Sequence, residues 1–146
     1  MSTKRQTILN NIKTIITGIT SGGSTLFKHV NITRIPPTEL DTTPFPAAFI
    51  YSDREVKFFD GENAVIGSET WDWSIIIEVW AQDKDMEDIL NSVHSAMFAD
   101  YKFTNTAEWS ERIGVELFTV DTSRSIEAML IPFRVIYRHI LGNMEA

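Results

Sequence analysis

Carboxylates close together in the sequence are the first candidates for chemistry in this chain. Asp53 and Glu55, and again Asp60 and Glu62, are separated by a single residue. Such a pair can serve acid–base catalysis when a concave site drives the two pKa values apart. Nothing in the flanking residues indicates a concave site, so we interpret both pairs as solvated charges on a hairpin.

A further acidic run resembles the start of a calcium-binding loop. Asp83, Asp85 and Glu87 alternate with other residues as the first ligands of such a loop do. The loop needs glycine at its sixth position, which is Asp88 here, and a helical pattern has already begun. The run is therefore predicted to cap a helix.

Nucleophilic and metal chemistry have no support in the sequence. His29, His94 and His139 fall on three separate predicted elements, and the chain has no cysteine. A Gly-x-Ser-x-Gly nucleophile elbow is missing as well. We predict a protein that is not an enzyme and that has no catalytic residues, no metal site and no cofactor.

Trp71, Trp73 and Trp80 could stack on the bases of a nucleic acid or lie inside a sheet. A stacking surface needs a basic groove beside its aromatic rings. Residues 53–88 carry eleven acids and three bases, a net charge of −8, whereas the other residues sum to +1. Binding of a polyanion is therefore disfavoured, and the acids indicate a soluble surface or one that stays near nucleic acid without retaining it.

Residues 71–82 alternate with the period of a β-strand, which divides the tryptophans between two faces. One face is entirely apolar and is predicted to be buried: Trp71, Trp73, Ile75, Ile77, Val79 and Ala81. Trp80 shares the other face with polar residues. It must be covered by a helix, by another subunit or by nothing.

Two amphipathic helices are predicted, over residues 3–18 and 83–100. Thr3 and Gln6 can cap the first helix, and Gly18 marks its end. The buried stripes are Ile8, Leu9, Ile12, Ile15, Ile16 and Ile19 in the first helix, and Met86, Ile89, Leu90, Val93 and Met97 in the second. The N-terminal stretch contains too many polar residues for a signal peptide or membrane anchor.

Strands account for most of the remaining pattern. They are predicted over residues 26–35, 47–52, 113–121 and 125–141, with loops at 20–25 and 101–112 and a proline-rich connector at 35–46. Asp60-Gly61 predicts the turn of a hairpin within residues 54–71. Pro132 suggests an edge or a bulge in the last strand. The fold class is a single α+β domain over residues 1–146: a mostly antiparallel β-sheet, two main helices packed on one face and a protruding β-hairpin.

This layout resembles the tail terminator proteins of long-tailed bacteriophages, also described as minor tail protein U-like or tail completion proteins. The resemblance rests on the N-terminal helix, the proline-rich connector into "PFPAAFIYS", the passage "WSIIIEVWAQDKDMEDILNSVHSAMF" and the C-terminal "DTSRSIEAMLIPFRVIYRHI". It spans nearly the whole chain. The acidic stretch 53–88 matches no motif of that family.

The resemblance implies a structural virion protein without enzymatic activity. Members of the family form a hexameric ring that caps the tail tube, stops its polymerisation and presents the docking surface for the head connector. The implied partners are further copies of the chain, the major tail tube protein and a connector or stopper protein, with DNA only in transit and no membrane. The implied location is the head-proximal end of the tail in the virion, and the host cytoplasm during assembly.

A ring needs two different contact patches on each subunit. Phe58 and Phe59 are adjacent beside the predicted turn, so a lone hairpin would expose at least one of them. The candidate contact residues are Arg54, Lys57, Phe58, Phe59, Asp60, Glu62, Trp80, Arg134 and Arg138. A neck or head-completion protein of the same virion is one alternative, and a small acidic adaptor or enzyme that forms no ring is another.

Overall fold

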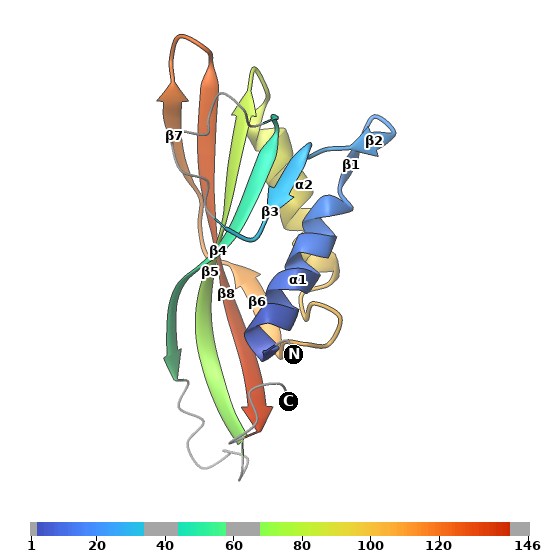
Figure 1. Ribbon diagram of the computed structural model, residues 1–146, viewed down its shortest axis with the longest axis vertical. Helices are drawn as coiled ribbons and strands as arrows, with labels where there is room; N and C mark the ends of the chain where they lie inside the picture. The colour runs from blue at the N-terminus through green and yellow to red at the C-terminus, as the bar shows by residue number, and fades with distance from the viewer. Residues whose placement is uncertain (1–2, 34–43, 58–67, 141–146) are drawn as a thin grey trace.

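A six-stranded sheet with helices on one face is the framework of the computed structural model, which describes residues 3–33, 44–57 and 68–140 (Figure 1). The elements follow the chain as α1 (Lys4–Thr17), β1 (Thr20–Ser21), β2 (Ser24–Thr25), β3 (His29–Asn31), β4 (Ala47–Lys57), β5 (Ser68–Gln82), α2 (Met86–Ala99), β6 (Trp109–Arg112), β7 (Glu116–Asp121) and β8 (Ile126–Ile140).

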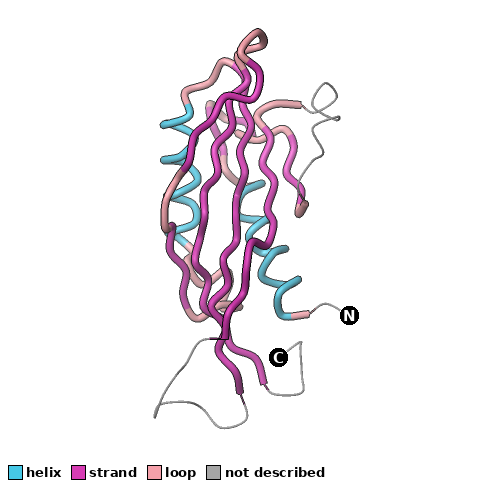
Figure 2. The backbone as a smooth tube through the Cα atoms, turned by 90° about the vertical axis from the view of Figure 1, so that its left-hand side faces the viewer, coloured by secondary structure: helices cyan, strands magenta, loops and turns pink. Residues whose placement is uncertain are grey.

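The strand order in the sheet is β3-β4-β5-β8-β6, and β7 pairs with β8 beyond the end of β6. Only the β3–β4 pair is parallel among the strand pairs that the structure describes. Figure 2 looks onto the sheet with both helices behind the strands, so both helices cover the same face. The predicted α+β class, with a mostly antiparallel sheet and two helices on one face, is confirmed.

Both helices form where the sequence predicts them, but α2 begins at Met86 instead of residue 83, and Leu9 and Ile15 of the predicted α1 stripe are only partly buried. Thr3 caps α1 by accepting a 3.1 Å hydrogen bond from the backbone of Gln6, and Gly18 ends the helix. Asp85 caps α2 by accepting a 2.9 Å bond from the backbone of Glu87, so the acidic run serves a helix end. The buried residues are Ile8, Ile12 and Ile16 in α1, and Met86, Ile89, Leu90, Val93 and Met97 in α2.

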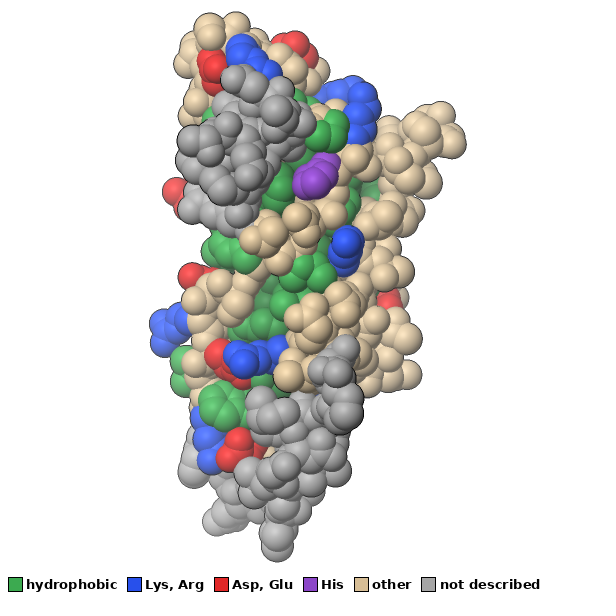
Figure 3. Space-filling model, viewed as in Figure 1, with side chains coloured by type: hydrophobic (Ala, Val, Ile, Leu, Met, Phe, Trp, Pro, Cys, Tyr) green, Lys and Arg blue, Asp and Glu red, His purple; other side chains and the backbone are tan. Residues whose placement is uncertain are grey.

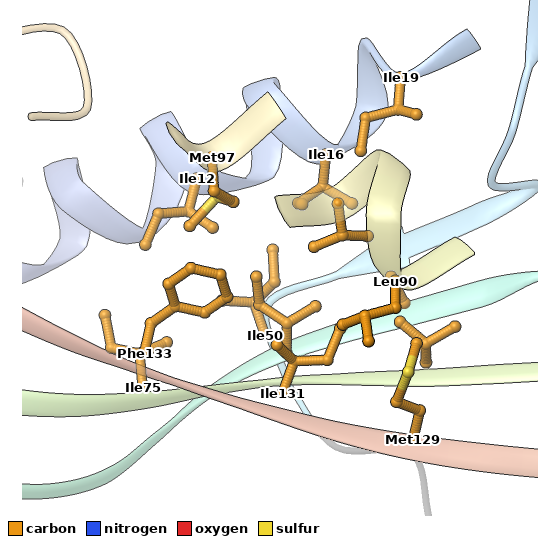
Figure 4. Packing of buried hydrophobic residues seen from close by; sticks show 14 of the residues in the cluster. Ile12, Ile16, Ile19, Ile50, Ile75, Leu90, Met97, Met129, Ile131 and Phe133 are labelled. Carbon is orange, nitrogen blue, oxygen red and sulfur yellow. The ribbon is translucent and has the colours of Figure 1, made fainter. Parts of the chain in front are cut away.

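The main core lies between the helices and the sheet. Figure 4 shows isoleucines of α1 and the Leu90 and Met97 side chains of α2 meeting those of the strands. Trp73 belongs to this core with 1% of its surface exposed, and its indole nitrogen donates a 2.8 Å bond to Ser52 Oγ. Trp71 is partly buried against the same cluster. Alternation therefore assigns both tryptophans to the correct face.

The strands that flank the predicted hairpin are present and paired. β4 and β5 are antiparallel, with a register shift between Ser52 and Arg54, and they stay in register as far as Lys57 opposite Trp71. At the bottom of Figure 1 these strands and β8 run past the end of α1. The predicted turn itself falls within residues 58–67, which lie outside the described residues.

Three local expectations are wrong in detail. Residues 20–25 are not a simple loop, because β1 and β2 form a small hairpin around Gly22 and Gly23, both at positive φ. The predicted loop 101–112 contains β6. The strand expected at 26–35 is regular only over β3, although residues 34 and 35 lie outside the described residues.

Pro132 does not mark an edge of the sheet, but the predicted irregularity is present in the neighbouring chain segment: three residues, 113–115, lie opposite two residues of β8, 131–132. β8 is an inner strand, with β5 on one side and β6 and β7 on the other. The Pro132 carbonyl accepts a 2.9 Å bond from Ile113, so its missing N–H would also face that side. It lies where the neighbour of β8 changes from β6 to β7, so the missing donor falls at a break in the ladder.

Neither α1 nor α2, the helices of the described chain, is long and apolar enough to cross a bilayer.

Candidate protein interface

The nine predicted contact residues fall into separate groups in the structure. Phe58, Phe59, Asp60 and Glu62 lie outside the described residues. Arg54 and Lys57 are exposed on β4, where the Lys57 ammonium is 3.7 Å from the Glu69 carboxylate. The other three residues lie on the sheet face that carries no helix.

Trp80 is buried within the single chain, with 5% of its surface exposed. It packs in a second cluster with Ala47, Phe49 and Ala128, on the sheet face away from the helices. The edge of its ring meets Phe49 at 5.8 Å between centroids. Its cover is therefore neither a helix nor a second subunit, and as folded it offers almost no surface to a partner.

Arg134 and Arg138 lie on β8 directly beside the acidic strand β5. Arg134 Nη2 is 2.9 Å from Asp72 Oδ2, and this partner raises the pKa of the guanidinium. Arg138 Nε donates a 3.1 Å bond to Thr70 Oγ1. The predicted basic face is thus partly neutralised by its neighbours.

Of the two carboxylate pairs interpreted as solvated charges, only Asp53 and Glu55 lie in the described residues, and Glu55 is partly buried with partners of its own. Glu55 accepts a hydrogen bond from the Tyr137 hydroxyl and pairs with Arg5 at 2.8 Å. Burial, followed by this bond, raises the pKa of Tyr137 above its ordinary range. Asp53 instead accepts a 3.4 Å bond from Ser74. Glu55 therefore fastens α1 to β4 and β8, which is a structural role.

One side of the sheet carries nearly all the exposed apolar residues. Among the described residues, seven of the eight exposed large hydrophobic side chains fall between residues 98 and 118. We call this set the apolar edge: Phe98, Tyr101, Trp109, Ile113, Val115, Leu117 and Phe118. Phe98 has 72% and Leu117 has 57% of its surface exposed. Exposed apolar side chains that gather in one region are typical of sites where proteins contact one another.

The backbone of the same side is open as well. β6 and β7 pair only with β8 in the described part of the chain, so their outer N–H and C=O groups face away from the sheet. On the opposite side, β3 pairs with β4 only at Ala47–Phe49. Among the described strands, therefore, the two sides of the sheet differ in their neighbours, and the outer side of β6 and β7 is the one that could accept a partner's strand.

A hollow lies at the lower part of the apolar edge, between α2 and β6. We call it the α2–β6 groove; its volume is about 520 Å³. His94 and Phe98 stack with their ring centroids 6.3 Å apart, and Lys102 lies 5.9 Å from the ring of Tyr101. The groove is lined by His94, Met97, Phe98, Tyr101, Trp109, Ser110, Glu111, Arg112 and Phe133.

Charge does not distinguish a ligand site on the face of the molecule that Figure 3 shows. On the face in Figure 3, acidic and basic side chains lie in small mixed groups with hydrophobic side chains between them. In the described ranges, no three histidine or carboxylate side chains converge to hold a metal ion.

The apolar edge was not predicted as one surface. The sequence assigned its residues to a helix, to the loop 101–112 and to the strand 113–121, and local pattern does not show which of these side chains stay exposed. Of the four residues of β6, only Ser110 is buried. One feature of the sequence could have indicated this surface: aromatic residues are concentrated between Phe98 and Phe118, where no buried helix stripe is predicted.

Comparison with known proteins does not assign the chain to a family: no family model matches its sequence, and no curated protein matches it.

Proposed function

We propose that this protein is a structural component of a phage tail that closes into a ring on the end of the tail tube. The ring would stop tube polymerisation and present the docking surface for the head connector. The tail terminator resemblance of the sequence suggests this role, and the arrangement of the sheet supports it.

The supporting observation is the pair of different sides of one sheet. The apolar edge lies along β6 and β7, whereas the exposed part of β4, with Arg54 and Lys57, lies on the other side. A closed ring of identical subunits requires such a head-to-tail contact, in which one patch meets a different patch of the next subunit. Burying the aromatic residues of the apolar edge would provide the anchor of that contact.

Several acidic side chains are exposed and have no cationic partner described here, and these suit a ring through which DNA passes. Glu78 is buried, and Glu55 and Asp72 each have a cationic partner. By contrast, Asp83, Asp85, Glu87 and Asp88 are exposed around the start of α2. A wall that presents these residues would repel the phosphate backbone and let the DNA slide.

The direct test is electron microscopy of the purified protein mixed with polymerised tail tubes. We expect extra ring-shaped density at one end of each tube and an arrest of further tube growth. Binding to connector or portal rings alone would instead indicate a neck or head-completion protein.

Sedimentation of the chain alone and with tube protein supplies the second comparison. A protein that stays monomeric and binds neither tubes nor connectors would contradict the proposal. Such a result would favour a small acidic adaptor or an enzyme.

A further inference from the structure

The α2–β6 groove has the properties of a socket for aromatic side chains. Phe98, Tyr101 and Trp109 line it while remaining exposed. Its volume of about 520 Å³ lies within the range of pockets that enclose a ligand. Aromatic residues that line such a hollow supply most of the binding energy when a partner's side chain enters it.

The groove also carries a cationic group that can receive a carboxylate. Arg112 lines it and has no ion-pair partner among the residues that the structure describes. Glu111 also lines the groove, but it lies opposite Arg134 on β8, which attracts its charge. His94 lies on the opposite wall, on α2. The matching occupant is therefore an aromatic residue followed closely by an acid.

The chain itself contains such a segment. Phe58 and Phe59 follow the end of β4 directly, and Asp60 is the next residue. The geometry points to the α2–β6 groove as the socket for Phe58 and Phe59 of a neighbouring copy of this chain, with Arg112 placed to receive Asp60. This inference rests on the proposed ring.

The spacing of the strands points to a second copy as the source of the occupant. The order β4-β5-β8-β6 places three strand spacings, about 14 Å, between β4 and β6. Phe59 is the second residue after Lys57, so the extended backbone covers about 7 Å at most. β4 also points along the sheet rather than across it. The spacing of the strands therefore favours the groove of a neighbouring copy over the chain's own groove.

A contact between these two sites is directional. The donor segment follows β4 and the socket adjoins β6, on opposite sides of one sheet. Each copy would therefore use its donor on one neighbour and its socket on the other. Closure of this chain of contacts gives a ring.

Disulfide trapping tests the contact without interference, because the natural chain has no cysteine. The variant Phe59→Cys/Phe98→Cys is oxidised in free solution and again while bound to tube ends. A disulfide requires the two Cα atoms to approach within about 7 Å. We expect a ladder of crosslinked multimers, and a heterodimer as the largest product when the two single-cysteine variants are mixed.

The matched control replaces Phe98→Cys with Asn91→Cys, which is exposed two turns earlier on α2. It should give no ladder. An internal crosslink, seen as a monomer without free thiols, would overturn the proposal in favour of the chain's own segment. Absence of any crosslink in both settings would also overturn it.

The outcomes separate this contact from the proposed function. Tube capping by wild-type protein without a crosslink in the double variant would refute the socket and leave the terminator role standing. A ladder from a protein that never binds tube ends would establish the contact and refute that role.

Discussion

The indole nitrogen of Trp80 donates a 2.7 Å hydrogen bond to the carboxylate of Glu78, two residues earlier on β5. The other oxygen of this buried carboxylate accepts a 2.8 Å bond from the Tyr51 hydroxyl. A buried carboxylate is stabilised when its oxygens are hydrogen-bonded. Glu78 therefore organises the second cluster from within the sheet.

Replacement of Glu78 should weaken the fold. Glu78→Ala removes the acceptor of both bonds and leaves a void, so we expect the free energy of unfolding to fall by about 3 kcal/mol. Glu78→Gln retains an acceptor oxygen and should lose less. Urea denaturation measures both; equal stability of Glu78→Ala and wild type would contradict the role given to this side chain.

Tyr137 should make the protein sensitive to alkali. Its pKa is raised in the folded state, mainly by burial, so the folded protein binds the phenol proton more tightly than the unfolded chain. The corresponding stability is fully present below about pH 10 and is lost as the pH rises through the folded-state pKa. Denaturant unfolding across the alkaline range should show this decline.

The matched variant is Tyr137→Phe, which cannot titrate at this position. It should lose about 1 kcal/mol at neutral pH with the hydrogen bond to Glu55. Its alkaline decline should be shallower than that of wild type, and parallel declines would rule out the assignment.

The pair formed by Asp72 and Arg134 should contribute modestly. Both Nε and Nη2 of Arg134 approach Asp72 Oδ2, at 3.0 and 2.9 Å. The side chains are 37% and 30% exposed, so solvent screens their attraction. A double-mutant cycle with Asp72→Asn and Arg134→Gln should give a coupling of about 0.5 kcal/mol, smaller in high salt. A coupling that does not change with salt would argue against an ion pair.

The apolar edge should govern association rather than stability. Because Leu117 is mostly exposed, Leu117→Lys should change the free energy of unfolding by less than about 0.5 kcal/mol. It should nevertheless shift sedimentation towards the monomer. Thr119→Lys adds the same charge to β7 without removing an apolar side chain. Equal loss of association in both variants would assign the effect to charge alone.

The elements predicted well are those whose side chains repeat with the period of a buried face. The α2 stripe from Met86 to Met97 and the β5 residues from Trp73 to Ala81 face one continuous core, so local pattern determines their orientation. β6 shows the opposite case. Its pairing with β8 is long-range, and three of its four residues avoid the core.

The candidate site was less predictable than the fold, because contact surfaces depend on which elements become neighbours. Polar flanks in the sequence suggested an open Trp80, but the partners of its cluster come from β4 and β8. The sequence suggested that Arg134 is an unpaired cation, but in the fold Asp72 of β5 lies beside it. The α2–β6 groove exists only because a helix and a strand separated by a loop lie together.

The position of Pro132 has a consequence for how far the sheet can grow. β8 has fifteen residues, but β6 and β7 expose their outer backbone in separate pieces of four and six, with the change of neighbour opposite Pro132. A long, flat strand would invite copies to add without limit, as in a fibril. Because the outer backbone is interrupted here, a strand of another copy could pair with only a short segment. This favours an assembly of finite size over an open-ended one.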